Sequence, residues 1–222
     1  EKGMTAIVGE SGCGKSTVVN MLIGAYRPKA GEVTVGGKPL ESVTRESYYS
    51  HFASVSYNTY IFNDTVRANF ELAKKNATDE EIWAALEAVN LADFIKENGG
   101  LDKVITEDAN NVSGGQKQRL ALAVNLVADK DIYVFDEATS NIDIESEAII
   151  MDNIKAMSKN KSVIVISHRL ANVVPADNIY YMEEGEVKEH GSHAQLMSAQ
   201  GGYAKLFNTQ KALEEGYREV SV

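Results

Sequence analysis

Residues 9–16, GESGCGKS, combine three glycines with a lysine and two serines in one short turn. The apolar run MTAIV before the turn is typical of a buried strand, and STVVNMLIGAY after it has the pattern of a helix. In that setting the glycines allow backbone N–H groups to curl around a phosphate, Lys15 reaches the β- and γ-phosphates, and the Ser16 hydroxyl ligates Mg²⁺. A glycine-rich turn with a chance lysine is disfavoured, because the whole motif occurs in the required strand-to-helix context.

The residues expected to bind the nucleotide are Gly9, Glu10, Ser11, Gly12, Cys13, Gly14, Lys15, Ser16 and Thr17. Lys15 is expected to face solvent, so that its loss would remove phosphate binding and leave the fold intact. Cys13 is expected to be open to alkylation, because it lies in a loop that leads into a helix N-terminus.

Two further apolar runs end in residues suited to phosphate chemistry. The run DIYVFDEA ends in Asp136 and Glu137, and SVIVIS is followed by His168. Ligands of open α/β sheets bind at the carboxyl ends of the strands, where all three residues are expected. Asp136 is expected to hold Mg²⁺, Glu137 to orient and polarise an attacking water, and His168 to contact the γ-phosphate. An acidic helix cap and a structural histidine are the alternatives, and the neighbouring phosphate site favours the catalytic interpretation.

The stretch NNVSGGQKQRLALA predicts a helix that begins at an unusual sequence. Ser113 and Gln116 fit a capping box, yet Gly114 and Gly115 stand in the first turn. Each glycine there costs the helix about 1 kcal/mol relative to alanine. A helix N-terminus with exposed N–H groups suits an anion, so this stretch predicts a second phosphate contact.

The composition restricts the class of protein. The chain has 222 residues, of which 44% are hydrophobic, and a net charge of −10. That charge disfavours a nucleic-acid partner, and the single cysteine excludes an internal disulfide. No run approaches the roughly 18 apolar residues of a membrane span.

The pattern of elements predicts an α/β fold with a mainly parallel sheet flanked by helices. Continuous apolar runs indicate strands at both ends of the chain, with GEVTVGG and ASVSY as two more and NIYYME and EVKEHG as a terminal hairpin. The intervening region has helical periodicity, with a capping box at Thr78 and Glu81. A single domain over 1–222 is expected, with a core of about 1–63 and 129–222 and a helical subdomain of about 64–128.

In this order, the glycine-rich loop, VSGGQ, FDEATSNID and SHRL resemble the nucleotide-binding domain of ATP-binding cassette (ABC) transporters. The resemblance implies an ATPase that uses ATP and Mg²⁺ and pairs head to tail with a second such domain, as a homodimer or a heterodimer. Ser113, Gly114, Gly115 and Gln116 would then cover the γ-phosphate held by the partner. Asp143 matches the loop that crosses the dimer interface.

Two segments are similar to ABC exporters in particular. YIFNDTVRANF resembles the exporter segment that touches the membrane domain, and Glu107 in TEDANNVSGGQ matches an exporter acid. The resemblance implies a transmembrane domain, fused upstream, and a location on the cytoplasmic face of the membrane.

Two departures from the family pattern stand out. Tyr57 replaces the glutamine that links the metal site to the membrane domain, and a phenol cannot offer the paired donor and acceptor of an amide. The chain also begins after the position of the family's N-terminal strands, so the aromatic that stacks on adenine is expected to be absent.

The leading hypothesis is the ATP-hydrolysing motor of an exporter. A soluble ABC ATPase acting on ribosomes or DNA is one alternative, which the acidic charge and the lack of heptads disfavour. A degenerate cassette with little turnover is another. The presence of Glu137 and His168 argues against a degenerate cassette, whereas Tyr57 and the expected absence of the N-terminal strands argue for one.

Overall fold

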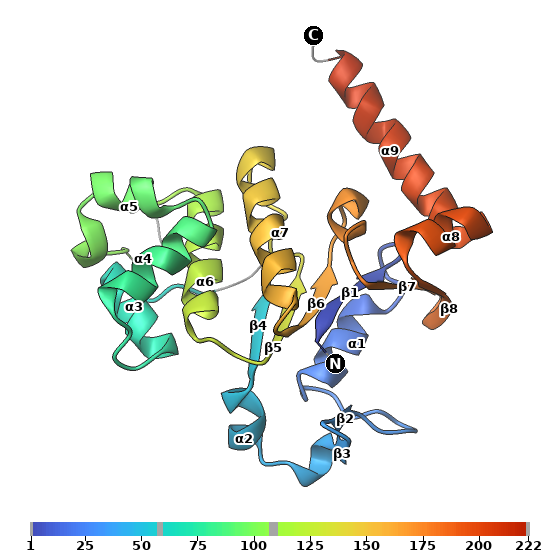
Figure 1. Ribbon diagram of the computed structural model, residues 1–222, viewed down its shortest axis with the longest axis horizontal. Coiled ribbons are helices and arrows are strands. Elements are labelled where there is room, and N and C mark those ends of the chain that lie inside the picture. The colour runs from blue at the N-terminus through green and yellow to red at the C-terminus, as the bar shows by residue number, and fades with distance from the viewer. Residues whose placement is uncertain (1, 57–59, 107–110, 221–222) are drawn as a thin grey trace.

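The computed structural model describes residues 2–56, 60–106 and 111–220. Its centre is a six-stranded sheet in the order β4-β5-β6-β1-β7-β8 (Figure 1). The strands are β1 (Gly3–Val8), β4 (Phe52–Ser56), β5 (Ile132–Asp136), β6 (Ser162–Ile166), β7 (Asn178–Glu183) and β8 (Glu186–Gly191). Neighbouring strands run parallel except β8, which is antiparallel to β7. The predicted α/β class with a mainly parallel sheet is therefore confirmed.

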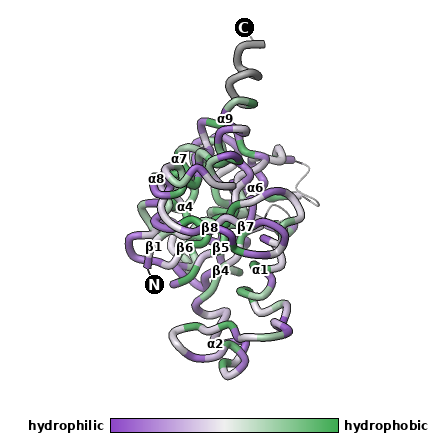
Figure 2. The backbone as a smooth tube through the Cα atoms, turned by 90° about the vertical axis from the view of Figure 1, so that its right-hand side faces the viewer, coloured by the Kyte–Doolittle hydropathy of each residue, from purple (hydrophilic) through white to green (hydrophobic). Residues whose placement is uncertain are grey.

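Helices cover both faces of this sheet. The helix α1 (Lys15–Leu22) packs its Val19 in a cluster with Ile7 and Val134, whereas Ile150 of α7 (Ile144–Ser158) belongs to the larger cluster with Ala6. Ala6 and Ile7 are neighbours in β1, so their side chains point to opposite faces. The buried strands account for the hydrophobic centre of the backbone in Figure 2.

Among the described residues between β4 and β5, four α-helices form a group beside β4 (Figure 1). They are α3 (Val66–Ala73), α4 (Asp79–Ala88), α5 (Ala92–Glu97) and α6 (Gly114–Val127), with the short η2 (Gly100–Asp102) after α5. Their shared core includes Phe70 and Leu86, which are both fully buried. Thr78 and Glu81 form the predicted capping box of α4.

The remaining elements lie around the sheet. They are the two-stranded β2 (Thr34–Val35) and β3 (Lys38–Pro39), η1 (Leu40–Ser42), α2 (Arg45–Ser50), η4 (Leu170–Val173), α8 (His193–Ala199) and α9 (Gly202–Val220). The expected strand at GEVTVGG is reduced to two residues, because glycines bracket it closely. The helices α2 and α9 were not predicted from the sequence, and α9 extends away from the sheet in Figure 1. In the part of the chain that the structure describes, no helix is long and apolar enough to cross a membrane.

Candidate functional site

The parallel register brings three predicted segments to one edge of the sheet. Ile166 pairs with both Ile7 and Asp136, so β1, β5 and β6 end together. The glycine-rich loop follows β1, the two acids end β5, and His168 follows β6. This edge therefore holds the predicted phosphate, metal and water-activating residues.

Glycine is required at Gly9 by both backbone conformation and space. Its φ is 152°, and an added Cβ would lie 2.2 Å from the Met182 carbonyl oxygen and 2.7 Å from the Cys13 Sγ. Gly14, at the N-cap of α1, has a left-handed φ of 105°. The loop can therefore turn tightly against β7 and point its N–H groups inward.

Lys15 does not face solvent, so that expectation was wrong. The residue is 6% exposed, and its Nζ donates to the carbonyl oxygens of Gly9 at 2.8 Å and Glu10 at 2.9 Å. The ammonium folds back because these carbonyl groups lie within its reach on the inner side of the loop. The positive charge is thereby held at the centre of the loop.

The predicted accessibility of Cys13 is also wrong. Its side chain is buried with Ile7, Val19 and Met182 in the cluster on the α1 face of the sheet. The thiol therefore behaves as a small apolar side chain, which packs the loop against the sheet.

Glu137 and His168 form a direct contact. The His168 Nε2 lies 2.7 Å from the Glu137 Oε1, with side-chain exposures of 55% and 30%. Glu137 has a left-handed φ of 53°, and its N–H donates to the Ile166 carbonyl oxygen at 2.9 Å. A non-glycine residue in this conformation is uncommon, and such strain clusters at functional sites. The arrangement can fix a carboxylate beside the glycine-rich loop.

Asp136, the residue expected to hold a metal, ends β5 and is half-buried. Burial raises the pKa of its carboxyl, the nearby Glu137 raises it further, and Lys15 and His168 act in the opposite direction. Among the described residues, no group of three or more His, Cys, Asp or Glu side chains could hold a metal ion by itself. A carboxylate such as Asp136 is a donor that suits Mg²⁺, which binds through one or two protein oxygens together with substrate phosphates and water.

We expect Asp136→Asn to raise the melting temperature of the metal-free chain at neutral pH. The raised pKa means that the ionised carboxyl is less stable in the folded chain than in the unfolded chain, and an amide removes this penalty. The gain should shrink as the pH falls through the pKa of the folded state, because Asp136 is then protonated in the wild type too. Thermal melts without Mg²⁺ at pH 7 and at about pH 4 test this, near the ordinary pKa of aspartate. A lower melting temperature for the variant at pH 7 would contradict it.

The start of α6 has the predicted capping box. Ser113 Oγ accepts from the Gln116 N–H at 3.2 Å, and Gln116 Oε1 accepts from the Ser113 N–H at 2.8 Å. The two glycines differ: a Cβ on Gly115 would lie 3.0 Å from the Asn141 carbonyl oxygen, whereas a Cβ on Gly114 would meet nothing within 4 Å. Gly115 thus packs against the neighbouring loop, and Gly114 leaves the helix start open to an approaching group.

Asp143 lies in the loop that packs on Gly115, and it is the N-cap residue of α7. Its Oδ1 accepts from the Ser146 N–H at 2.8 Å, and this hydrogen bond holds the pKa of the carboxyl below its usual range. The other expected coupling residues, Tyr57 and Glu107, lie outside the described residues.

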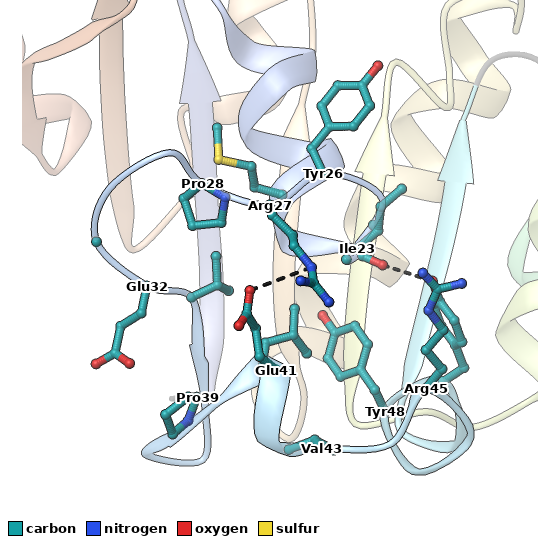
Figure 3. Close-up of a pocket in the computed structure, with 16 residues that line it drawn as sticks. Ile23, Tyr26, Arg27, Pro28, Glu32, Pro39, Glu41, Val43, Arg45 and Tyr48 are labelled. Carbon is teal, nitrogen blue, oxygen red and sulfur yellow. Dashed lines mark hydrogen bonds and ion pairs between the residues drawn. The ribbon is translucent and has the colours of Figure 1, made fainter.

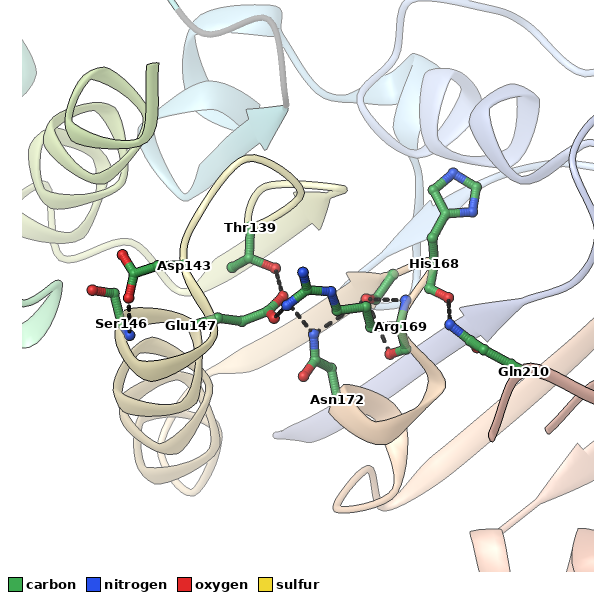
Figure 4. A network of polar contacts seen from close by, with 9 residues as sticks. Thr139, Asp143, Ser146, Glu147, His168, Arg169, Asn172 and Gln210 are labelled. Atoms are coloured by element: carbon green, nitrogen blue, oxygen red, sulfur yellow. Dashed lines mark hydrogen bonds and ion pairs between the residues drawn. The ribbon is translucent and has the colours of Figure 1, made fainter. Parts of the chain in front are cut away.

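A polar network next to this edge of the sheet was not predicted from the sequence. It consists of Thr139, Glu147, Arg169 and Asn172, and Gln210 of α9 donates to the His168 carbonyl oxygen (Figure 4). Gln118 is also buried, and its Nε2 donates to the Ala138 carbonyl oxygen at 2.6 Å. The only sequence signal for the network is a pair of glutamates in the first turn of a helix.

A separate pocket of about 260 Å³ lies at the far end of α1, next to β3 and α2 (Figure 3). Arg27 and Glu41 form an ion pair there at 3.6 Å, and the Tyr48 hydroxyl donates to the Leu22 carbonyl oxygen at 2.5 Å. The pocket contains none of the predicted site residues.

The parallel sheet, the glycine-rich loop between β1 and α1, and the acids at the end of β5 define a P-loop nucleotide-binding fold. The sequence profile of the family described as ABC transporter matches residues 1–140. The chain belongs to this family, as an ATP-binding domain of its ATPases.

Relatives of the chain cover nearly all of it. It is 47% identical over 218 residues to an uncharacterized ABC transporter ATP-binding protein of Haemophilus influenzae, covering 98% of this chain and 39% of the relative. It is 41% identical to an ATP-dependent lipid A-core flippase of Aliivibrio fischeri, covering 92% and 36%. The structure of a bacterial Atm1-family ABC exporter with ATP bound matches with a TM-score of 0.90 and 34% identity, covering 94% and 37%. The chain thus spans less than two-fifths of each of these proteins.

Proposed function

We propose that the chain is the ATP-hydrolysing motor of a membrane exporter, working as a head-to-tail dimer on the cytoplasmic face of the membrane. The observation that carries this proposal is the 2.7 Å contact between Glu137 and His168 at the edge where the glycine-rich loop ends. It supports a water-orienting role for Glu137 beside the glycine-rich loop. The relatives named as a lipid A-core flippase and an Atm1-family exporter support the exporter class.

In the proposed reaction, a water oxygen attacks the γ-phosphorus and the bond from that phosphorus to the bridging oxygen of ADP breaks. The glycine-rich loop and Lys15 hold the phosphates. Glu137 accepts a hydrogen bond from the water, aligns it and takes up its proton as the new bond to phosphorus forms, and His168 keeps that carboxylate in place and contacts the γ-phosphate. Ser16 and Asp136 would hold Mg²⁺, which supplies positive charge to the phosphate oxygens when bound.

An exposed aromatic pair supports a membrane-domain partner. Tyr60 and Phe62 are 64% and 53% exposed, and their rings meet edge to face at 5.0 Å. Asn69 anchors the backbone of Phe62, because its amide accepts from the Phe62 N–H at 2.8 Å and donates to the Phe62 carbonyl oxygen at 3.1 Å. Such an exposed aromatic pair suits a protein contact, and it lies in the segment similar to exporters.

The intact Glu137–His168 contact favours a working ATPase over a degenerate cassette. The test is phosphate release from MgATP over a range of protein concentrations. A head-to-tail dimer completes each site with a second chain, so the specific activity should rise with concentration and then level off. A specific activity that is constant down to the lowest concentration, or an absence of hydrolysis, would contradict the proposal.

A further inference from the structure

Glu147 is a buried carboxylate to which the proposed reaction gives no role. It lies in the first turn of α7, and its side chain is 5% exposed. It accepts hydrogen bonds from the Thr139 hydroxyl at 2.7 Å, from the Asn172 Nδ2 at 2.8 Å and from the Arg169 guanidinium (Figure 4). A buried charge needs such partners, and charge-assisted hydrogen bonds are the stronger ones.

The donors around Glu147 come from two different segments of the site. Thr139 follows Glu137 by two residues, and Arg169 directly follows His168. Asn172 lies in η4, and its Nδ2 is also 3.4 Å from the Ser167 Oγ. One carboxylate therefore ties the segment after β5 to the segment after β6.

The Glu137–His168 contact depends on interactions that fix the backbone segments carrying these two residues. More than half of the His168 side chain is exposed, so packing does not fix the ring. Glu137 adopts a left-handed backbone conformation that its surroundings have to impose. Gln118 donates to the Ala138 carbonyl oxygen next to Glu137, and Gln210 donates to the His168 carbonyl oxygen, but each holds one segment. Glu147 contacts both.

We propose that Glu147 is a positioning residue that sets the distance between Glu137 and His168 by holding Thr139 and Arg169 together. The inference rests on the proposed function, because the aligned pair is what the hydrolysis step requires. Glu147 itself touches neither water nor phosphate in this scheme.

The first test compares Glu147→Gln with Glu145→Gln in the full chain. Both variants remove one negative charge from the first turn of α7, and Glu145 is exposed. In Glu147→Gln the amide NH₂ has to face a donor, either the Arg169 guanidinium or the Asn172 amide, so one contact is lost and the two segments should move apart. A small displacement at a reacting centre costs up to about 100-fold, so kcat should fall by about 10- to 100-fold while the affinity for MgATP stays unchanged. Glu145→Gln should retain the wild-type kcat.

The second test observes the His168 ring directly, without relying on hydrolysis. The chain has four histidines, so their imidazole NMR signals can be resolved and His168 assigned with a His168→Gln variant. Glu137→Ala supplies the reference position for a ring that has lost its carboxylate. In Glu147→Gln the His168 signal should move toward that reference, and the other histidine signals should stay in place.

Three results would overturn the inference: an unchanged His168 signal, an unchanged kcat, or an equal loss in both glutamate variants. If the wild type hydrolyses no ATP, the proposed function fails, and the His168 signal still decides the role of Glu147. If Glu147→Gln does not fold, Thr139→Val decides, because it removes one donor at nearly constant volume. Thr139→Val should move the same signal and lower kcat, and Thr139→Ser should restore both. A wild-type signal or kcat in Thr139→Val would equally refute the role.

Discussion

Lys15→Ala should weaken the binding of MgATP by about 100-fold. The variant removes an ammonium expected to make two charge-assisted contacts to phosphate, each contributing roughly 1.5 kcal/mol. The structure adds a second effect, because the Nζ also donates to the Gly9 and Glu10 carbonyl oxygens. The variant should therefore have a lower melting temperature even without nucleotide. Equilibrium titration with a fluorescent ATP analogue and thermal melts measure the two effects.

Lys29→Ala is the matched control for Lys15→Ala. Lys29 is exposed, and its loss changes the net charge equally. It should leave both binding and melting temperature unchanged. Wild-type affinity in Lys15→Ala would remove this lysine from the phosphate site, whereas wild-type melting with weakened binding would show that its two carbonyl contacts contribute little to stability.

The location of the candidate site could be predicted because strand ends are local features of a sequence. Each apolar run ends in a residue with distinct chemistry, and parallel strands bring those ends to one edge. Asp136, Glu137 and His168 meet there although they come from two different strands. The prediction of this site needed only the types of these residues and their positions after an apolar run.

The hydrogen-bond network that holds the site residues could not be predicted, because its contacts join residues that lie far apart in the sequence. Glu147 accepts hydrogen bonds from residues on both sides of it in the chain, and Gln210 of α9 donates to the His168 carbonyl oxygen. In the sequence, a glutamate in the first turn of a helix looks like an ordinary partner of the helix dipole. Neither the burial of Glu147 nor the identity of its donors follows from that pattern.

The errors at Lys15 and Cys13 have a related cause. The motif gives the ligand chemistry of a lysine, but the carbonyl groups within its reach decide where its Nζ lies. Likewise, the position of Cys13 in a loop gives no sign that Met182 of β7 helps to bury it. The local sequence therefore indicates which chemistry these side chains can perform, but not which groups surround them in the folded chain.

Glu137→Gln should reduce ATP hydrolysis by at least about 100-fold, which is the lower range of a general-base contribution. The amide keeps the shape of the side chain and cannot accept a proton from water. Binding of MgATP should remain, because the glycine-rich loop is untouched. The closed, ATP-bound dimer should therefore accumulate in this variant, and ADP should not produce it, because ADP lacks the γ-phosphate.

The amount of ATP-bound dimer tests whether the start of α6, which Gly114 leaves open, contacts the phosphate held by a partner chain. Ser113→Arg, added to Glu137→Gln, should abolish the shift from monomer to dimer on addition of MgATP while each chain still binds ATP. It also removes an N-cap, which costs about 1 kcal/mol, so the matched control is Ser192→Arg at the equivalent capping box of α8. Sedimentation with and without nucleotide should show dimers in the control and monomers in the Ser113 variant. Dimers in both would mean that the start of α6 faces something other than a partner's phosphate.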